Sequence, residues 1–560
     1  TVNGEIYNHK ALWEEHCPTR NRKYKTDCEI IIPLYEKFGC DVVHYLDGIF
    51  AFVIYDKKEK SFFAARDPIG VLPLYYNSDL SSNLNGHIFI SSECKCMREE
   101  EINHQFFMQE NTRIIPPGHS LYFHPNMEGP FTPQKYYYPK WETQPLNILS
   151  PHVDMELLQA TLRQKLTNAV EKRLMSEVPF GVLLSGGLDS SLIASITSRL
   201  MKKRGKGPIH TFSIGFEEEG FNEFEFSRAV SEKYGTNHHE ITLNPDKYLA
   251  SMGDLIRIKD APLGVPNEVP LFLMSKRLKK DITVVLSGEG ADEIFGGYGR
   301  IFRSADDVEL ISEWEARDFE TESELGKRLR DRYGGSFDSE IEMFLHLYRY
   351  TDMNRLEKLI GENNIENFLN GPTRMAFERA FSEVEGQDFS TKMMYVFESL
   401  HLPGLLQRLD STTMGASVEG RVPFVDHNLV EYAFTIPTEL KMRWKDNAPK
   451  DVIGADSSEV FDTTKWILKQ ACSDILPSEI IERKKLGFPV PLKAWFGSEI
   501  LDYAEQMLTN GRLVNSGLIS REGAIEIIHE ERKSGTESML IWMLMNLEIF
   551  LGSFPDLIIP

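Results

Sequence analysis

Val-Leu-Leu-Ser-Gly-Gly-Leu-Asp-Ser-Ser, residues 182–191, is the stretch that decides the fold of the longer part of this chain. Pro179 to Leu184 is an uninterrupted apolar run, which is typical of a buried parallel strand. The pattern is helical from Ser190 onward, so the two glycines form a tight turn between a strand and a helix. Such a turn directs backbone N–H groups toward an anion at the positive end of a helix dipole. The stretch therefore predicts a phosphate-binding loop.

Asp189 lies in this loop and adds a metal ion to the prediction. A carboxylate beside a phosphate is unfavourable unless a cation lies between them, so we expect Asp189 to bind Mg2+ and the loop to bind ATP. A Walker A loop needs Gly-x-x-x-x-Gly-Lys followed by Ser or Thr, and the chain contains no such string, which disfavours kinase and P-loop ATPase chemistry. Taken alone, the stretch also fits a Gly-Gly turn whose Asp or Ser merely caps a helix.

A second strand and acidic turn occur at Ile282–Tyr298, Ile-Thr-Val-Val-Leu-Ser-Gly-Glu-Gly-Ala-Asp-Glu-Ile-Phe-Gly-Gly-Tyr. In open parallel sheets, ligands bind outside the carboxyl ends of strands, so the two turns are expected to converge on one nucleotide. Asp292 would be the second Mg2+ ligand, and Glu289 is placed to hold or deprotonate a reacting group. Compensation of a helix dipole is the alternative role for these acidic residues.

The two turns together carry a family resemblance. Ser-Gly-Gly-Leu-Asp-Ser resembles the loop of the ATP pyrophosphatase (PP-loop) superfamily, and Ser287–Tyr298 resembles the signature of the glutamine-hydrolysing asparagine synthetases. Two further blocks match in the expected order, Arg408–Asp426 and Arg483–Pro491. The resemblance extends over nearly the whole chain.

The resemblance implies roles for individual residues of the second part of the chain. Glu289 matches a glutamate implicated in forming the aspartyl-adenylate and handling ammonia, and Lys485 matches a lysine that neutralises the α-phosphate. Asp189 and Asp292 match the metal ligands. The matched ATP-binding residues are Leu184, Ser185, Gly186, Gly187, Asp189, Ser190, Ile214, Ser287 and Gly288. The charged residues matched to the synthetase site without separate tasks are Glu293, Asp410, Glu419 and Arg421.

The chain opens with a segment, Asn3-Gly4-Glu5-Ile6-Tyr7-Asn8, that resembles the class II glutamine amidotransferase domain. A glutamine substrate offers an ammonium, a carboxylate and an amide, so its site needs both carboxylates and N–H donors. The residues matched to glutamine binding are Asn3, Gly4, Glu5 and Asp27.

This domain departs from the family pattern in its nucleophile. The family uses an N-terminal cysteine whose free amine acts as base, whereas this sequence starts at Thr1 inside what is expected to be a later strand. Asn3-Gly4-Glu5 follows Thr1 too closely for Thr1 to serve instead, and internal cysteines lack the free amine. Two explanations stay open: an incomplete gene model or processed fragment, which we favour because exposed sheet edges are a liability, or a protein that uses free ammonia.

Composition limits the remaining possibilities. Hydrophobic residues make up 41% and charged residues 26% of the chain, values typical of a folded globular protein. A net charge of -22 argues against a nucleic-acid partner. Six scattered cysteines without a Cys-x-x-Cys pair fit a reducing compartment, and we expect a cytoplasmic protein. The closest approach to a membrane span, Met539–Leu551, contains Asn546 and Glu548 and reads as a buried helix.

We therefore predict a two-domain α/β protein. Residues 1–140 form an incomplete Ntn-hydrolase-like αββα domain, residues 141–152 a linker, and residues 153–560 a doubly wound parallel-sheet PP-loop domain with additional helices. The predicted activity is asparagine synthesis from aspartate, ATP and an amide nitrogen donor through a β-aspartyl-AMP intermediate. The donor is glutamine in the intact family and ammonia for this chain as written, Mg2+ is the metal, and a homodimer is possible.

Two alternatives are open, the first another enzyme and the second a protein of a different functional class. A β-lactam synthetase-like enzyme would close a ring with its substrate's own nitrogen, but the persistence of Asn3, Gly4, Glu5 and Asp27 favours a glutamine user. A noncatalytic binding protein of the same fold is disfavoured by intact Asp189, Glu289, Asp292 and Lys485.

Overall fold

A computed structural model provides the structure of the chain. It describes residues 1–18, 25–77, 89–97, 112–124, 132–138, 154–316, 323–449, 452–485, 487 and 489–555. The predicted linker, 141–152, lies outside these residues.

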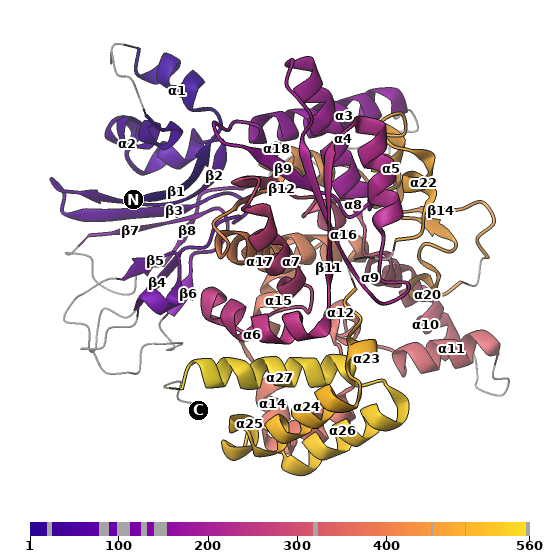
Figure 1. Ribbon diagram of the computed structural model, residues 1–560. Helices are drawn as coiled ribbons and strands as arrows, with labels where there is room; N and C mark the ends of the chain where they lie inside the picture. The colour runs from indigo at the N-terminus through magenta and orange to yellow at the C-terminus, as the bar shows by residue number, and fades with distance from the viewer. Residues whose placement is uncertain are drawn as a thin grey trace.

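Two antiparallel sheets form the first part of the chain, at the left of Figure 1. Side chains alternate between the faces of strand β2, so that Phe50 and Phe52 pack under helices α1 and α2 while Ala51 faces the second sheet. The larger sheet has the order β1 (Val2–Ile6), β2 (Gly48–Asp56), β3 (Ser61–Arg66), β7 (His119–Phe123), β8 (Gln134–Lys135), and the smaller has β5 (Ile90–Ser91), β4 (Tyr75–Asn77), β6 (Thr112–Ile114). The helical segments are α1 (His9–His16), η1 (Asp27–Ile30), α2 (Ile31–Phe38), η2 (Gly39–His44) and η3 (Cys94–Met97).

A five-stranded parallel sheet forms the centre of the second part. Its order is β11 (Asn237–Leu243), β10 (His210–Phe216), β9 (Phe180–Leu183), β12 (Val284–Leu286), β13 (Glu419–Arg421). The chain runs outward from β9 to β11 and then returns to place β12 on the other side of β9. The direction of winding therefore switches between β9 and β12, the position where open α/β sheets bind ligands.

Helices cover both faces of the parallel sheet, as the right-handed crossovers require. Helix α3 shows why they form: Asp154 caps it by accepting from the Leu157 amide, and Leu158, Leu162 and Leu166 make a buried stripe. One face carries α3 (Met155–Arg173), α4 (Leu188–Lys203) and α5 (Phe224–Tyr234), and the other carries α6 (Pro245–Lys259), α7 (Glu268–Leu278) and α17 (Leu402–Met414).

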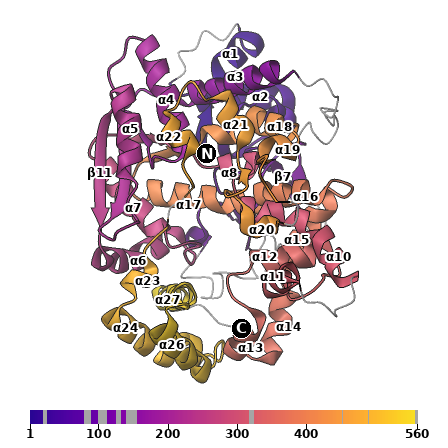
Figure 2. The ribbon, with the colours of Figure 1, turned by 90° about the vertical axis from the view of Figure 1, so that its right-hand side faces the viewer.

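Most of the additional helices between β12 and α17 pack around a core that includes Phe302, Phe344 and Phe397, whereas α8 packs against the core of the parallel sheet and Leu359 of α13 against the C-terminal helices. Figure 2 shows them on the side of the molecule opposite β11. They are α8 (Ala291–Phe295), α9 (Gly299–Phe302), η5 (Arg303–Asp306), α10 (Asp307–Ala316), α11 (Glu324–Tyr333), α12 (Glu340–Tyr348), α13 (Met353–Ile360), α14 (Glu362–Leu369), α15 (Pro372–Glu383), α16 (Phe389–Val396) and the π-helical turn η6 (Phe397–His401).

The rest of the chain ends in a group of helices drawn in yellow in Figure 1. The predicted buried helix at Met539–Leu551 is α27, and no helix in the described ranges is both long and apolar enough to cross a membrane. The elements are η7 (Pro423–Val425), α18 (His427–Phe434), α19 (Thr438–Lys441), β14 (Arg443–Trp444), α20 (Gly454–Ser457), β15 (Asp462–Thr463), α21 (Trp466–Ala471), α22 (Ser478–Glu482), α23 (Leu492–Trp495), α24 (Ser498–Asn510), α25 (Arg512–Asn515), α26 (Arg521–Ser534) and α27 (Ser538–Ser553).

One of the hydrophobic cores extends across the junction of the two parts. Ile49, Ile69 and Val71 of the first part belong to the same buried cluster as the residues of strands β9 and β12. Lys172 on α3 bridges Asp47 at 2.7 Å and Asp426 at 3.0 Å across the junction. The two-domain α/β prediction is confirmed, and the domains are joined by apolar and ionic contacts.

Candidate active site

The phosphate-binding loop predicted from the sequence connects β9 to α4. Ser190 Oγ accepts a hydrogen bond from the Ser185 amide at 3.1 Å and lies 3.0 Å from Ser185 Oγ. The Gly187 amide donates to Ser185 Oγ at 3.2 Å. These bonds close the turn on itself and fix its backbone at the amino end of α4, where the helix dipole favours an anion.

Gly186 gives the loop its shape. Its φ is +80°, in the left-handed region, and a Cβ added there would lie 2.6 Å from the Cβ of Phe226 and 2.8 Å from the Ser227 amide. Its carbonyl accepts a hydrogen bond from Arg483 at 3.0 Å, and Arg483 also pairs with Glu223. Only glycine fits this position, and Arg483 holds the loop from behind.

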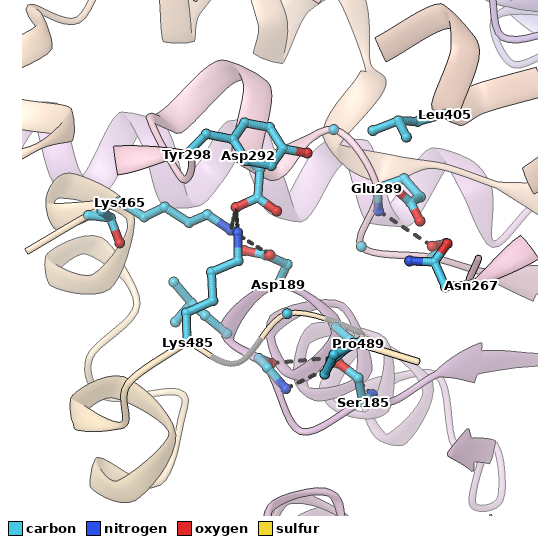
Figure 3. A pocket seen from close by; sticks show the side chains of 18 of the residues that line it. Ser185, Asp189, Asn267, Glu289, Asp292, Tyr298, Leu405, Lys465, Lys485 and Pro489 are labelled. Atoms are coloured by element: carbon cyan, nitrogen blue, oxygen red, sulfur yellow. Dashed lines mark hydrogen bonds and ion pairs between the residues drawn. The ribbon is translucent and has the colours of Figure 1, made fainter. Parts of the chain in front are cut away.

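Two lysines join the acidic residues of the two turns, as Figure 3 shows. Lys465 Nζ lies 2.5 Å from an Asp189 carboxylate oxygen and 2.7 Å from an Asp292 carboxylate oxygen. Lys485 Nζ lies 2.6 Å from the same oxygen of Asp292. The prediction that the two turns converge is therefore confirmed, since their carboxylates share one ammonium group.

Neighbouring charges determine the ionisation of the Asp292 carboxyl group and of Lys465. Burial opposes the ionised form of Asp292, but Lys465 and Lys485 outweigh it and hold the pKa of that carboxyl well below its usual range. Burial likewise disfavours a charged Lys465, yet Asp189 and Asp292 raise the pKa of its ammonium. Lys465 has an exposed side-chain fraction of only 4%, against 35% for Lys485. The buried lysine is thus a permanent positive charge between two carboxylates.

A cavity of about 1160 Å3 opens over these residues. Most of the predicted ATP-binding and catalytic side chains line it, whereas Gly186 forms the turn behind it and Glu293 is buried beneath it. The predicted residues that line the cavity are Leu184, Ser185, Gly187, Asp189, Ser190, Ile214, Ser287, Gly288, Glu289, Asp292 and Lys485.

Glu289 is held on the far side of the cavity from the lysines. Its carboxylate lies 2.5 Å from Arg408 Nη2, and Arg408 Nη1 donates to the Asn267 side chain at 2.9 Å. Arg408 Nε is buried without a hydrogen-bond partner. The arrangement gives this end of the cavity a fixed carboxylate beside a cation.

Glu293 sits below the acidic turn on α8. Its carboxylate accepts a hydrogen bond from the Tyr298 hydroxyl at 2.6 Å. Burial and the neighbouring Asp292 raise the pKa of Glu293 to about 7. Its side chain therefore supports Tyr298, which lines the cavity.

The other three charged residues matched to the synthetase site lie outside the cavity, at the junction of the two parts. Arg421 is 1% exposed, and its guanidinium contacts Glu419 at 2.6 Å and Glu5 at 3.0 Å. Burial, together with Glu93, raises the pKa of Asp410 to about 7. Sequence order places these residues near the synthetase motifs, but the fold turns their side chains toward the first domain.

Three of the four residues matched to glutamine binding, Gly4, Glu5 and Asp27, lie close together near this same junction. The Ile6 amide donates to Asp27 at 2.5 Å, and the Cys28 thiol donates to the Gly4 carbonyl at 3.3 Å. Burial raises the pKa of Glu5 to about 7 against the opposing charge of Arg421, and Asp27 adds to the rise. Asn3 lines a separate hollow of about 320 Å3 between the two antiparallel sheets.

Thr1 continues the ladder of strand β1. Its amine donates to the Val53 carbonyl at 2.9 Å, and its carbonyl accepts from the Val53 amide at 2.9 Å. Strand β1 begins at Val2, so Thr1 lies directly before the strand and extends its pairing with β2. All six cysteines are free thiols.

Lys465 is the residue that the sequence analysis missed. It precedes α21 in the left-handed conformation, with a φ of +51°, and Trp466 beside it also lines the cavity. Thr464-Lys465-Trp466 contains no glycine turn and no neighbouring acidic residue, so nothing in the local sequence distinguished this lysine.

Comparison with known proteins identifies the family. The family model described as Asparagine synthase matches residues 161–552, and the model described as Glutamine amidotransferase domain matches residues 1–122. The chain is 42% identical to asparagine synthetase [glutamine-hydrolyzing] 1 of Arabidopsis thaliana over 93% of this chain and 70% of that protein. It is 27% identical to asparagine synthetase [glutamine-hydrolyzing] 1 of Bacillus subtilis over 97% of this chain and 83% of that protein. It is 30% identical to asparagine synthetase [glutamine-hydrolyzing] 3 of the same bacterium over 95% of this chain and 82% of that protein. Both family models match in order along the chain, and its two turns meet in one cavity. This protein therefore belongs to the asparagine synthase family.

Proposed function

We propose that this protein is an ATP-dependent carbon–nitrogen ligase that makes asparagine from aspartate, ATP and an amide nitrogen donor. The observation that carries the proposal is the junction of Asp189, Asp292 and Lys465 at the switch point of the parallel sheet. The family and the names of its relatives supply the reaction class. The bond to be formed is an amide, and the products are AMP and pyrophosphate.

We propose one orientation for ATP in the cavity. We place the pyrophosphate on the loop from Ser185 to Ser190, because backbone N–H groups and the amino end of α4 meet there. The adenosine then lies against Leu184, Ile214, Ser287 and Gly288, which line the same cavity. This orientation directs the α-phosphate toward the two lysines.

Asp189 and Asp292 fit a magnesium ion. Asp189 Oδ1 is buried without a hydrogen-bond partner, which suits an oxygen that awaits a cation. The described residues contain no group of three or more metal-ligating side chains, so the remaining ligands would come from the phosphates and water. When bound, the ion neutralises phosphate charge and favours pyrophosphate as a leaving group.

The chain's own residues then prepare the carboxylate of aspartate for attack by a nitrogen. A carboxylate resists amine attack, and transfer of AMP to its oxygen makes a β-aspartyl-AMP with a good leaving group. Lys465 and Lys485 supply positive charge where the α-phosphate gains negative charge. Glu289, fixed by Arg408, accepts the proton that ammonia loses as the amide forms.

We also propose that glutamine is the nitrogen donor, bound by Asn3, Gly4, Glu5 and Asp27. The functional domains are residues 1–140 and 153–560, and the matched segments 1–122 and 161–552 lie within them. Free thiols and the small-molecule substrates favour a cytoplasmic enzyme without a nucleic-acid partner. A homodimer is a further proposal, which light scattering would check.

The test is to incubate the chain with ATP, Mg2+, aspartate and ammonium chloride and to measure asparagine and pyrophosphate. We expect equal amounts of both, and loss of both in Asp189→Asn without loss of folding. Ring closure of an acyclic substrate without ammonia would favour the β-lactam synthetase-like alternative. Failure to exchange pyrophosphate into ATP in the presence of aspartate would favour a noncatalytic protein and overturn the proposal.

A further inference from the structure

Arg421 has every guanidinium N–H group engaged. Arginine carries five donors, and here two reach Glu419, at 2.6 and 3.3 Å, while Nη2 also reaches Glu5 at 3.0 Å. Nη1 donates to the carbonyls of Arg173 at 3.0 Å and Met175 at 2.5 Å. The side chain is thus clamped between the end of α3, its own strand and one carboxylate of the first domain. A fully engaged, buried guanidinium has a single position.

The strand that carries Arg421 is short and lies at the edge of the sheet. Strand β13 has three residues, and its one partner among the described strands is β12. The Glu419 amide donates to the Thr283 carbonyl at 2.8 Å, and the Ser287 amide donates to the Arg421 carbonyl at 2.9 Å. A three-residue edge strand forms few ladder bonds, so side-chain anchors such as Arg421 contribute to its position.

The backbone of Arg421 leads directly into the nucleotide cavity. Ser287, its hydrogen-bond partner, lines the cavity together with Gly288 and Glu289. Ser287 Oγ in turn accepts from the Glu289 amide at 3.4 Å. A displacement of β13 would thus move the acidic turn that faces ATP and aspartate.

The opposite end of Arg421 reaches the first domain. Glu5 lies on strand β1, where it pairs with Ile49 of β2, and both residues belong to the scaffold of that domain. Glu5 also belongs to the set matched to glutamine binding. One side chain therefore spans from the candidate glutamine site to the strand beside the nucleotide.

We propose that Arg421 is a positioning residue that couples the two sites: its ion pair with Glu5 sets the place of β13 and so the affinity of the acidic turn for ATP. The inference rests on the proposed function, because it takes the cavity as the ATP site and Glu5 as part of the amino-acid site. It extends that function by naming the physical link between them. A plain structural clamp would stabilise the junction without changing nucleotide affinity.

The experiment compares two carboxylates of the first domain that pair with a cation of the second. Glu5 and Asp47 have similar exposed side-chain fractions, 22% and 23%, and lie 3.0 and 2.7 Å from Arg421 and Lys172. Among the described residues, Lys172 pairs with Asp47 and Asp426 and with no residue of β13, so Asp47 has no direct ionic link to that strand. Asp47→Asn is therefore the matched control for Glu5→Gln. The readouts are the Kd for ATP by calorimetry, the KM for ATP and kcat in the ammonia-dependent reaction, and the melting temperature.

We expect Glu5→Gln to weaken ATP binding at least about fivefold, a typical size for coupling between sites, while Asp47→Asn leaves the Kd unchanged. Arg421→Lys keeps the positive charge but loses the planar guanidinium, so it should weaken ATP binding similarly. The double variant Arg421→Lys, Glu5→Gln should bind ATP about as weakly as Arg421→Lys alone. Equal effects of Glu5→Gln and Asp47→Asn on the Kd, or a fall in melting temperature alone, would overturn the coupling and leave the proposed function intact. If the unaltered chain binds no ATP, the proposed nucleotide site is wrong and the inference fails with it.

Discussion

Lys465 stands at the centre of the site because two carboxylates, from the first turns of helices α4 and α8, meet on its ammonium. An isolated buried lysine would lose its proton, but Asp189 and Asp292 together keep this one charged. A charged group that is already fixed in place needs no reorganisation when a phosphate gains negative charge beside it. At the scale of the residue, this lysine is the strongest candidate for a catalytic cation.

Replacing Lys465 tests that role against Lys485. We expect Lys465→Met to lower aspartate-dependent pyrophosphate release by about 100-fold or more, the size seen when one preorganised donor is removed. Lys485→Met should have a smaller effect, because Lys485 is more exposed and contacts only one of the two carboxylates. Lys465→Met should also bind Mn2+ more tightly in the absence of nucleotide, because Asp189 and Asp292 lose the cation that they share. Electron paramagnetic resonance measures the fraction of Mn2+ bound. Equal losses in both variants would contradict the assignment.

Asp410 predicts a pH dependence of stability. Burial, with Glu93 and Glu419, raises its pKa to about 7 despite Arg66, so the folded chain holds a proton there that the unfolded chain releases near pH 3.8. The stability contributed by this group is complete below about pH 3.8 and is lost as the pH rises toward about 7. Asp410→Asn should therefore flatten the fall in unfolding free energy between these values, measured in urea. Asp254→Asn, at an exposed ion pair with Arg257, is the control and should keep the slope of the unaltered chain.

At the scale of the element, the loop between β9 and α4 depends on a backbone shape as much as on its side chains. Gly186 accepts a left-handed φ, and its missing Cβ leaves room for Phe226. Ser185 and Ser190 then close the turn by hydrogen bonds. The anion site is thus a product of packing behind the loop.

Alanine at Gly186 should abolish ATP binding, because the new Cβ would collide with the α5 segment. Gly205→Ala is the matched control: Gly205 also has a positive φ, +67°, but no atom lies within 4 Å of its added Cβ. We expect each variant to lose about 1 kcal/mol of stability through backbone strain. Only Gly186→Ala should lose pyrophosphate exchange, and retention of exchange in both variants would refute the packing argument.

The elements also show how much of the site the sequence could reveal. Asp189 and Asp292 could be identified because each follows a buried strand and a glycine turn within one continuous motif. Lys465 could not, because its role depends on the packing of α21 against two distant turns. Arg421 lies within a recognisable motif, but local sequence could not tell that its side chain points to Glu5 of the first domain. Contacts between distant segments were the missing information.

At the scale of the whole molecule, Asp426 links the domains through buried charges. Its carboxylate lies 2.9 Å from Arg173 and 3.0 Å from Lys172, and Lys172 continues to Asp47 of the first domain. Burial opposes the ionised carboxyl of Asp426, but these cations hold its pKa well below the usual range. The chain therefore keeps a charged network at the junction of its two parts.

Breaking this network should be costly. Asp426→Asn leaves Arg173 buried without its carboxylate, and we expect a loss of about 3–5 kcal/mol in the free energy of unfolding at neutral pH. Asp474→Asn, at the exposed ion pair with Arg163, should cost at most about 1 kcal/mol. Because the pKa of Asp426 is depressed, its contribution is present above the unfolded pKa and is lost as the pH falls through the folded one. The difference between Asp426→Asn and the unaltered chain should narrow in strong acid, as urea titrations would show.

The shared hydrophobic core determines how the molecule can be divided. Ile49, Ile69 and Val71 are buried among side chains of the second domain, so cutting the chain between the domains would bare an apolar face on each piece. A fragment carrying only the parallel sheet and its helices would then be prone to self-association and poor yield. Soluble expression of the ligase half by itself calls for polar replacements on that face, chosen among the residues that now touch these three side chains.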